Sequence, residues 1–516
     1  MSSFGPFEPD STRVEPPIPT SIPGLDLVLQ GGFPPGRVYL IQGDTGSGKT
    51  TLGMTFVLAG VRRGERCLYI TLSETRDELE AVAASHRWNL EGLEILDLAS
   101  ARAAIDADAE YTMFHPSEVE LGETTKAILQ AVETRNPVRV VIDSLSEMRL
   151  LAQTTLRFRH QILAIKHFFG SRDATVLLLD HGKEEDEMTV ASLVHGVLSL
   201  EQFWPAFGAQ RRRMKVVKMR GLRYSGGFHD LAIRTGGLEV FPRLVAAEHR
   251  AVRSSSVMTS GIAELDALTG GGLPSGSNTL VVGPSGSGKT TLSMHYVHHA
   301  LQQGQTAAVF AFEETPQILL MRTRSMGMDL EPYLNSGKLM FQPVDPAELS
   351  PGELAHAVMA AVDEHQAKIV VIDSLNGYMH SMPAERFLAV HLHELFTYLN
   401  HRDVLTLLIS AQHGLFGEKE ESVEASYLAD NVILIRFFEV RGEMRQAVSV
   451  IKKRGGPHER TIRELRMGER GITVGPPLRD MQGVLTGVPS IVGARRAGSD
   501  DRAAKRGCCL LYTSDA

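Results

Sequence analysis

The sequence predicts an α/β fold with two tandem domains, each a mostly parallel sheet flanked by helices. A phosphate-binding loop motif occurs twice, at residues 43–51 and 283–291. Each copy follows a short apolar run and precedes a run that is able to form a helix. The lysines of the two copies, Lys49 and Lys289, are 240 positions apart. A repeat of this length indicates a duplicated domain and not a short structural repeat.

Both loop motifs match the pattern G-x-x-x-x-G-K-[ST], whose chemistry is the binding of nucleotide phosphates. Glycines allow the tight turn that points backbone N–H groups at phosphate oxygens. The two lysines would reach the β- and γ-phosphates, and the threonine after each lysine would give its hydroxyl to Mg²⁺. The expected nucleotide-binding residues of the loops are Gly43, Thr45, Gly46, Ser47, Gly48, Lys49, Thr50 and Thr51, and Gly283, Ser285, Gly286, Ser287, Gly288, Lys289, Thr290 and Thr291.

The residues around each loop have the order strand, loop, helix. The apolar residues 38–41 precede the first loop, and residues 280–282 precede the second. Residues 52–61 and 292–301 are expected to form the helices that follow. A helix N-terminus attracts anions, so this order favours phosphate binding at the loop.

An apolar strand that ends in aspartate is expected in each half. Residues 138–142 precede Asp143, and residues 369–372 precede Asp373. In a phosphate-loop protein such a carboxylate holds Mg²⁺, usually through water. Apolar strands that alternate with helices indicate a parallel sheet, whose functional side chains lie at the carboxyl ends of its strands. The expected metal ligands are Thr50, Asp143, Thr290, Glu313 and Asp373.

Composition and motifs divide the chain into two domains with flanking segments. The expected bounds are 1–19 for a flexible lead, 20–248 for the first domain, 249–257 for a linker, 258–490 for the second domain and 491–516 for a disordered tail. The last residues, 509–516, resemble a translated sequencing adapter. We therefore expect part of the tail to be an artefact and the natural C-terminus to be missing.

The composition indicates a globular protein of the cytoplasm. The chain is 43% hydrophobic and 22% charged, which allows ordinary cores. Its net charge of −8 disfavours a general nucleic-acid binder. No run of 18 apolar residues occurs, so no membrane span is expected. The three cysteines give no sign of a disulfide framework.

Several motifs together resemble the KaiC family of RecA-like ATPases. They are the two loops, Asp143-Ser144, Asp373-Ser374, Phe312-Glu313-Glu314-Thr315, Lys-x-Arg-Gly at 218–221 and 452–455, and Val440-Arg441-Gly442-Glu443-Met444. The last motif, followed by Lys-x-Arg-Gly, is specific to the second KaiC domain. The resemblance covers roughly residues 13–480. It implies two RecA-like domains, ATP and Mg²⁺ as cofactors, and hexamers that bind ATP between neighbouring subunits.

The resemblance also implies roles for individual residues. Glu313 and Glu314 match the paired catalytic carboxylates of the second domain, and such a carboxylate can take a proton from the attacking water or hydroxyl. The first domain reads Ser73-Glu74, so Glu74 is its one remaining carboxylate of the pair. The residues that match γ-phosphate contacts on the neighbouring subunit are Lys218, Arg220, Lys452 and Arg454. Ser85 matches a nucleotide contact of the first domain.

The resemblance further implies a phosphorylation site in the second domain. Ser426 and Tyr427 stand where the clock proteins have serine and threonine. Ser426 is therefore the candidate, because Tyr427 does not fit a pocket shaped for threonine. Gln446 and Met326 stand where the family has a nucleotide-contacting arginine and a tryptophan. These departures indicate a KaiC-like relative and not a clock protein.

Three functions remain open from the sequence. The leading one is an oligomeric ATPase, expected to be hexameric, which acts as a signalling or timing switch with serine/threonine autokinase activity in its second domain. Its expected partner is a KaiB-like or two-component signalling protein, and neither a membrane nor nucleic acid is expected. The first alternative is a RecA-type DNA-dependent ATPase or recombinase. The second is a scaffold that nucleotide only holds together, for which Ser73 argues in the first domain.

Overall fold

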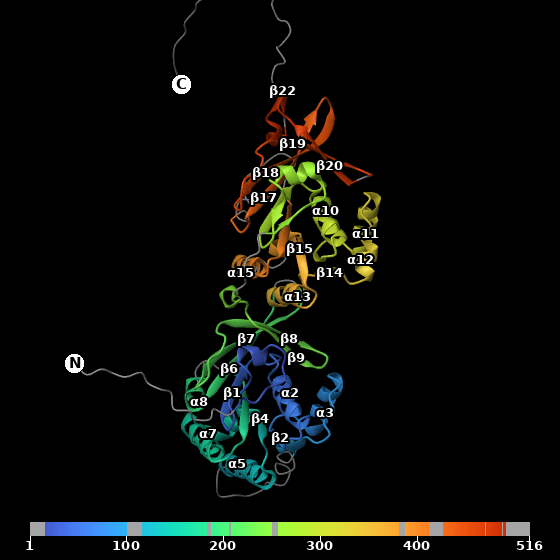
Figure 1. Ribbon diagram of the computed structural model, residues 1–516. Coiled ribbons are helices and arrows are strands. Elements are labelled where there is room, and N and C mark those ends of the chain that lie inside the picture. The colour runs from blue at the N-terminus through green and yellow to red at the C-terminus, as the bar shows by residue number, and fades with distance from the viewer. Residues whose placement is uncertain are drawn as a thin grey trace, which may run out of the picture. The chain divides into compact units, whose positions relative to one another are not determined.

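The described part of the chain forms two compact units, each built around one large sheet. The first sheet belongs to the blue and green part of the chain in Figure 1, and the second to the part from lime green to red. The computed structural model describes residues 16–100, 116–182, 187–205, 208–249, 256–380, 388–411, 427–469, 471–487 and 489–491.

The first sheet has nine strands in the order β3-β2-β4-β5-β1-β6-β7-β8-β9. Pairing is parallel from β3 to β6 along this order and antiparallel from β6 to β9. The carboxyl ends of the parallel strands therefore meet at one edge of the sheet. The strand bounds are β1 Val38–Gly43, β2 Cys67–Thr71, β3 Glu94–Asp97, β4 Arg139–Asp143, β5 Thr175–Asp180, β6 Gly196–Phe203, β7 Arg211–Met219, β8 Phe228–Arg234 and β9 Gly237–Phe241.

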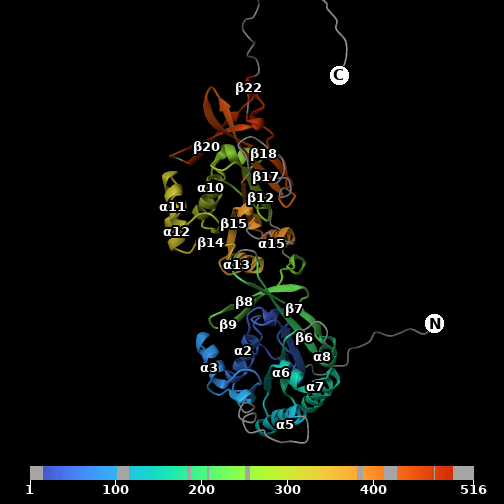
Figure 2. The same cartoon turned by 180° about the vertical axis from the view of Figure 1, so that it is seen from behind.

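Helices flank both faces of the first sheet (Figures 1 and 2). Tyr39 and Ile41 of β1 share a core with α1 and α2, whereas Val38 and Leu40 share a second core with α5, α6, α7 and α8. Alternate side chains of a strand point to opposite faces, so one apolar strand serves both cores. The helix bounds are α1 Leu25–Val28, α2 Lys49–Val61, α3 Arg76–Ser85, α5 Pro116–Arg135, α6 Leu145–Ala152, α7 Thr155–Gly170 and α8 Glu187–Leu193.

The second sheet repeats the first strand for strand, in the order β14-β13-β15-β16-β12-β17-β18-β19-β20. Its parallel half again ends at β17, from which the antiparallel half continues. The strand bounds are β12 Asn278–Gly283, β13 Thr306–Ala311, β14 Leu339–Pro343, β15 Ala367–Asp373, β16 Leu405–Ala411, β17 Asn431–Val440, β18 Glu443–Lys453, β19 Arg463–Gly468 and β20 Gly471–Pro477. Two-stranded ribbons join β10 Val257–Met258 to β11 Leu273–Pro274 and β21 Met481–Gln482 to β22 Ser490–Ile491.

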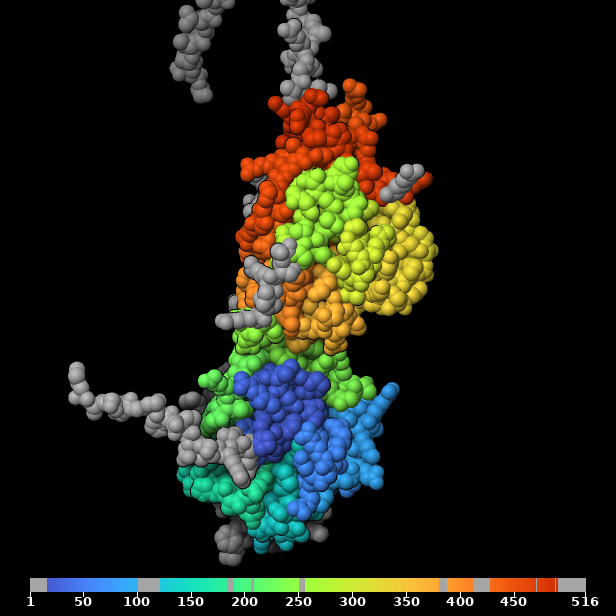
Figure 3. Space-filling model, in the orientation of Figure 1, coloured from blue at the N-terminus to red at the C-terminus, as the bar shows by residue number. Residues whose placement is uncertain are grey.

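The helices of the second half include α10 and α11, which pack on one core with residues of β12 and β15. Figure 3 shows the yellow surface of α11 and α12 beside the yellow-green surface of α10. The bounds are α9 Ala263–Leu268, α10 Lys289–Gln302, α11 Pro316–Ser325, α12 Glu331–Asn335, α13 Pro351–Asp363, α14 Leu375–His380 and α15 Leu388–His401. Among the described residues, every helix is too short or too polar to cross a bilayer.

The α/β fold class that the sequence predicts is confirmed, and the loop helices begin earlier than expected. They start at Lys49 and Lys289, three residues before the expected positions. Gly48 and Gly288 precede them with φ of 104° and 96°. Glycine adopts this left-handed conformation at little cost, so the loop can turn into its helix without further residues.

His295 on α10 is a partly buried imidazole whose Nε2 accepts the Ile472 N–H at 3.0 Å. Burial lowers the pKa of His295 from 6.5 to about 4. The unfolded chain therefore binds the proton more readily, and the free energy of unfolding should fall as the pH drops from 6.5 towards 4. Above pH 6.5 this group should have no effect.

We expect the loss from His295 to be about 2–3 kcal/mol across that window, measured from urea midpoints at several pH values. His295→Gln should flatten the dependence, because glutamine keeps a polar group and does not titrate. His365→Gln, which replaces an exposed histidine, is the matched control for the substitution itself. The same slope in His295→Gln and the parent chain would contradict this assignment.

Candidate nucleotide sites

Each phosphate loop turns tightly at the carboxyl end of a central strand and leads directly into a helix. Gly46 and Gly286 have φ of 79° and 75°. The helices α2 and α10 that follow run for 13 and 14 residues. In the described part of the chain, the hydroxyl oxygens of Ser47 and Ser287 are buried without a hydrogen-bond partner. Buried donors beside a helix N-terminus fit an anion such as phosphate.

The side chains of the two loop lysines fold back into the loops that precede them. Lys49 Nζ donates to two loop carbonyls at 2.6 and 2.8 Å, and Lys289 Nζ donates to one at 2.8 Å. Burial lowers the pKa of both lysines, and the carboxylates of Asp143 and Asp373 oppose the shift. A partly desolvated ammonium group at this place gives each loop a strong point charge for phosphate.

In both sites a threonine hydroxyl contacts an aspartate, and both residues are among the metal ligands expected from the sequence. Thr50 Oγ1 donates to Asp143 Oδ2 at 2.8 Å, and Thr290 Oγ1 donates to Asp373 Oδ2 at 2.6 Å. Oxygen ligands of this kind suit Mg²⁺, which keeps several waters and often takes phosphate oxygens. Within the described ranges, no group of three or more His, Cys, Asp or Glu could hold a metal by itself. The two pairs therefore fit an ion that is shared with phosphate and water.

Tyr69 on β2 is a site residue that the sequence analysis missed. Its hydroxyl donates to Asp143 Oδ2 at 2.6 Å, in addition to the bond from Thr50. Register makes Val309 its counterpart on β13, because Thr71 pairs with Asp143 as Ala311 pairs with Asp373. At this register position, a tyrosine therefore contacts the first aspartate, whereas the second site has a valine. Nothing in the sequence signals this, since Tyr69 reads as one more apolar strand residue.

Tyr69→Phe should weaken Mg²⁺-dependent nucleotide binding at the first site about three- to tenfold, because the Asp143 carboxylate loses the hydrogen bond from Tyr69 and keeps the one from Thr50. The measurement is a Mg²⁺ titration of nucleotide binding in a chain that carries Lys289→Ala. The control is Tyr39→Phe, which removes an equally buried hydroxyl that donates to the Pro34 carbonyl at 2.7 Å. An equal effect of both substitutions would mean that Tyr69 only stabilises the sheet.

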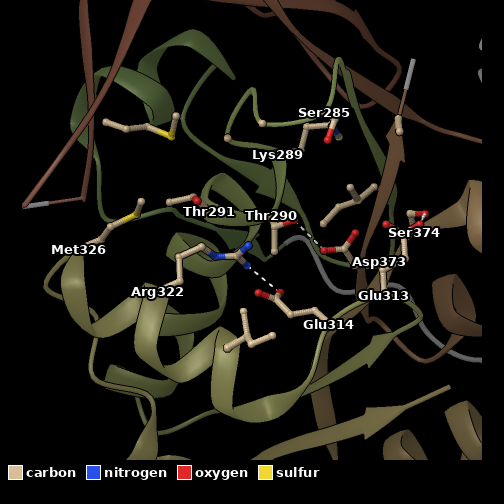
Figure 4. Close-up of a pocket in the computed structure, with 16 residues that line it drawn as sticks. Ser285, Lys289, Thr290, Thr291, Glu313, Glu314, Arg322, Met326, Asp373 and Ser374 are labelled. Carbon is tan, nitrogen blue, oxygen red and sulfur yellow. Dashed lines mark hydrogen bonds and ion pairs between the residues drawn. The ribbon is translucent and has the colours of Figure 1, made fainter. Parts of the chain in front are cut away.

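Two carboxylates reach the second site, where a cavity of about 460 Å³ lies beside the loop. Glu313 is exposed and accepts a hydrogen bond from Ser374 Oγ at 3.3 Å. Glu314 is partly buried and pairs with Arg322 Nη2 at 2.8 Å (Figure 4). Burial raises the pKa of Glu314, and the guanidinium of Arg322 opposes this. The predicted acidic pair therefore lines the cavity with two different environments.

The first site has one carboxylate at the corresponding place. Ser73 is exposed, and Glu74 is partly buried at the end of β2. Burial raises the pKa of Glu74, and the nearby negative charge of Asp143 raises it further. Glu74 Oε2 is buried without a hydrogen-bond partner among the described residues. The two sites therefore differ in both the number and the pairing of their acids.

The two sites differ in the hydrogen-bond network beside the loop strand, which is charged in the first site and neutral in the second. Asp180, at the end of β5, accepts a hydrogen bond from Ser146 Oγ at 3.0 Å and forms an ion pair with Arg149. In the second site Ser410 Oγ donates to Asn376 Oδ1 at 2.9 Å. The sequence alone did not single out these residues, although Asp180 is the last residue of β5 and Ser410 the last but one of β16.

Strand register shows that Asp180 and Ser410 occupy equivalent positions. They pair with Gln42 and Val282, the residues just before the first glycine of each loop. Burial raises the pKa of Asp180, and Arg149 opposes the shift. The first site therefore carries an ion pair next to its loop strand at a position that is uncharged in the second.

The two Lys-x-Arg pairs lie at the sheet edge opposite to the loops of their own units. Lys218 pairs across the strands with Val197 at the start of β6, and Lys452 pairs with Val432 near the start of β17. Both lysines donate to carbonyls of residues that precede these strands, at 2.7–2.9 Å. Because β6 and β17 run parallel to the loop strands, the loops lie at the other ends.

The remaining predicted residues have the following surroundings. Arg220 donates to the Ser192 carbonyl at 3.2 Å, and Arg454 pairs with Asp430 at 3.5 Å. Ser85 is exposed at the end of α3. Ser426 lies outside the described residues.

Comparison with known proteins identifies the family. The model of the family described as "ATPase: KaiC" matches residues 18–245 and 258–479. The "Circadian clock protein KaiC3" of Synechocystis sp. is 27% identical, over 91% of this chain and 94% of the relative. The "Circadian clock oscillator protein KaiC" of Thermostichus vulcanus is 26% identical over 94% of each chain, and that of Synechococcus elongatus is 26% identical over 91% of each. With two repeats of the family domain over most of its length, the chain belongs to the KaiC family of ATPases.

Proposed function

We propose that the chain binds ATP with Mg²⁺ at both loop sites and hydrolyses it, mainly at the second. The observation that carries this proposal is common to both units. A lysine buried in the loop lies beside a loop threonine whose hydroxyl donates to a strand-end aspartate. Membership of an ATPase family supports ATP as the nucleotide.

In the second site the side chains can divide the work of phosphoryl transfer. Lys289 and the loop N–H groups would hold the β- and γ-phosphates, and Thr290 with Asp373 would hold the metal ion. The bound ion would neutralise charge on the phosphate oxygens. Glu313 is exposed at the cavity and would accept the proton of the attacking water.

We infer a homo-oligomer, and the family resemblance makes it a hexamer. Lys218 and Lys452, like Arg220 and Arg454 after them, lie at the edge opposite to the loops. Within its own unit, each of these groups lies away from the nucleotide site, whereas a head-to-tail ring would bring it to the site of a neighbouring subunit. There an arginine would stabilise charge that develops on the γ-phosphate. Nucleotide would then also hold neighbouring subunits together.

Phosphate release by the purified chain, with and without DNA, tests the proposed function. We expect Mg²⁺-dependent hydrolysis that DNA does not change. Stimulation by DNA would favour a RecA-type DNA-dependent ATPase. Nucleotide binding without hydrolysis would favour a scaffold.

We propose a signalling or timing role for this ATPase in the cytoplasm. The named relatives are circadian clock proteins, which supports such a role. The low cysteine content, with Cys67 free, supports a reducing compartment. The proposed partner is a KaiB-like or two-component signalling protein. Size-exclusion chromatography of a mixture with a KaiB-like protein tests this, and unchanged elution of both proteins would count against a clock-type partner.

We also propose that the second site phosphorylates Ser426 of the same protein. Phosphoryl transfer depends mostly on alignment and charge stabilisation, so a serine within reach of the second site would suffice as acceptor. We expect one phosphate on Ser426 and none on Tyr427, found by phosphopeptide mapping after hours with Mg²⁺ and ATP. Ser426→Ala should lose the signal and keep hydrolysis. An unmodified Ser426 in an oligomer that hydrolyses ATP would leave a plain ATPase switch.

A further inference from the structure

Helix α11 and the residue that follows it present a row of side chains to the second nucleotide cavity. Ile318, Arg322 and Met326 follow one another at intervals of four residues, and all three line the cavity. Four-residue spacing places side chains on one face of a helix. A guanidinium group therefore stands between two apolar side chains, across the same cavity from Lys289 and Thr290 (Figure 4).

Arg322 has donor capacity beyond the one ion pair that it forms among the described residues. One terminal nitrogen, Nη2, donates to Glu314 Oε2 at 2.8 Å, and the side chain is 32% exposed. Its Nε is buried without a hydrogen-bond partner within the described ranges. A guanidinium carries five N–H donors in a planar fork, so one carboxylate contact does not saturate it. Its charge also reaches Asp373.

Helix α3 of the first site has no arginine at the equivalent position. Val82 on α3 holds the position that Arg322 holds on α11, 240 residues later. Glu74, the counterpart of Glu314, has an oxygen without a hydrogen-bond partner there. Loop, threonine and aspartate are nevertheless assembled in the same way in both sites. The arginine is therefore an addition to the second site and not part of the common framework.

We propose that Arg322 is a phosphate ligand of the second site, supplied by the same chain, and that it bridges Glu314 to the nucleotide's polyphosphate. This rests on the proposed function, because it needs ATP or ADP in the cavity. A planar guanidinium can bind a carboxylate and a phosphate oxygen with different N–H groups. The cavity lies between the loop and α11, so a polyphosphate on Lys289 faces Arg322. The second site would thereby hold phosphate charge from two sides.

Binding of a non-hydrolysable ATP analogue with Mg²⁺, measured by calorimetry, tests this proposal. The full chain carries Lys49→Ala throughout, so that binding is confined to the second site. Arg322→Met should weaken the affinity about tenfold or more, the range for a lost hydrogen bond to a charged group. Arg322→Lys should recover part of it, because it keeps the charge without the fork. Circular dichroism verifies that each variant is folded.

The matched control is Arg324→Met on the same helix. Arg324 is 59% exposed and pairs with Asp329 at 3.4 Å and with Glu331, away from the cavity lining. This substitution removes the same charge and should leave the affinity within about twofold of the parent. An equal loss in Arg324→Met and Arg322→Met would reduce the effect to net charge and overturn the proposal.

Repeating the measurement in a Glu314→Gln chain distinguishes direct binding of phosphate by Arg322 from an effect of Arg322 through Glu314. If Arg322 binds phosphate, Arg322→Met should weaken binding in a Glu314→Gln chain as well. If Arg322 only positions Glu314, its loss should have no further effect there, and that result would overturn the proposal. If the chain with Arg322 and Lys289 intact binds no analogue at all, the nucleotide function itself is refuted.

Discussion

Lys289→Ala should remove most of the ATP hydrolysis of the chain, whereas Lys49→Ala should remove less. The second site has Glu313 exposed at its cavity, while the first site has Ser73 in its place. Lys289→Ala removes the ammonium group that would stabilise the negative charge developing on the phosphate during hydrolysis. We expect the rate of the second site to fall at least about hundredfold. Phosphate release at saturating ATP gives the total rate of each variant.

The same two variants should differ in the opposite sense in assembly. A site that hydrolyses slowly keeps its nucleotide as a structural ligand, so Lys49→Ala should weaken ATP-dependent particles more than Lys289→Ala, as seen by light scattering. Lys338→Ala removes an exposed lysine of the second half and serves as the control for both measurements. Equal losses of hydrolysis in Lys49→Ala and Lys289→Ala would contradict the inequality of the sites.

Mixing two inactive variants, Lys289→Ala and Arg454→Ala, should restore part of the hydrolysis at the second site. Lys289 lies in the loop, whereas Arg454 follows β18 at the opposite edge of the sheet and pairs with Asp430 at 3.5 Å. In a ring, a complete site forms wherever an Arg454→Ala subunit gives the loop and a Lys289→Ala subunit gives the arginine. Random mixing in equal amounts should therefore restore about a quarter of the wild-type rate of this site.

Two controls make the mixing experiment decisive. Each variant alone gives the baseline, and a chain with both substitutions, mixed with either single variant, should restore nothing. A mixture no faster than the mean of its components would show that each chain completes its own site. Light scattering should also show larger particles with ATP than without nucleotide, and a monomer saturated with ATP would refute the oligomer.

The framework of each site could be predicted from the sequence because it depends on local pattern. Glycine spacing determines the loop, and an apolar run that ends in aspartate marks the strand beside it. The contacts of Thr50 with Asp143 and of Thr290 with Asp373 follow once both strands lie in one parallel sheet. The first residues of the loop helices are predicted less accurately than the loops, because Gly48 turns the chain into its helix within a single residue.

The rest of each site depends on contacts that local pattern does not contain. Tyr69 reaches Asp143 only because β2 and β4 are neighbours, although 74 residues separate them. Arg322 looks like one of several helix charges until α11 is placed against the cavity. The sequence likewise does not predict all four strands of each antiparallel half. In these strands polar and apolar residues alternate, so the long apolar runs that mark the parallel strands are missing.

The ion pair of Asp180 with Arg149 restricts how the two halves of the chain can evolve. Asp180 has a side chain only 5% exposed, and removing one partner of a buried pair typically costs about 3–5 kcal/mol. Arg149→Met alone would leave this buried carboxylate without the guanidinium that pairs with it, and Asp180→Ser alone would remove the carboxylate that pairs with Arg149. Conversion of the first site to the neutral arrangement of Ser410 and Asn376 therefore requires several substitutions at once. Copying a short stretch of the second half into the first would therefore destabilise the first unit wherever that stretch replaced only one of these two partners.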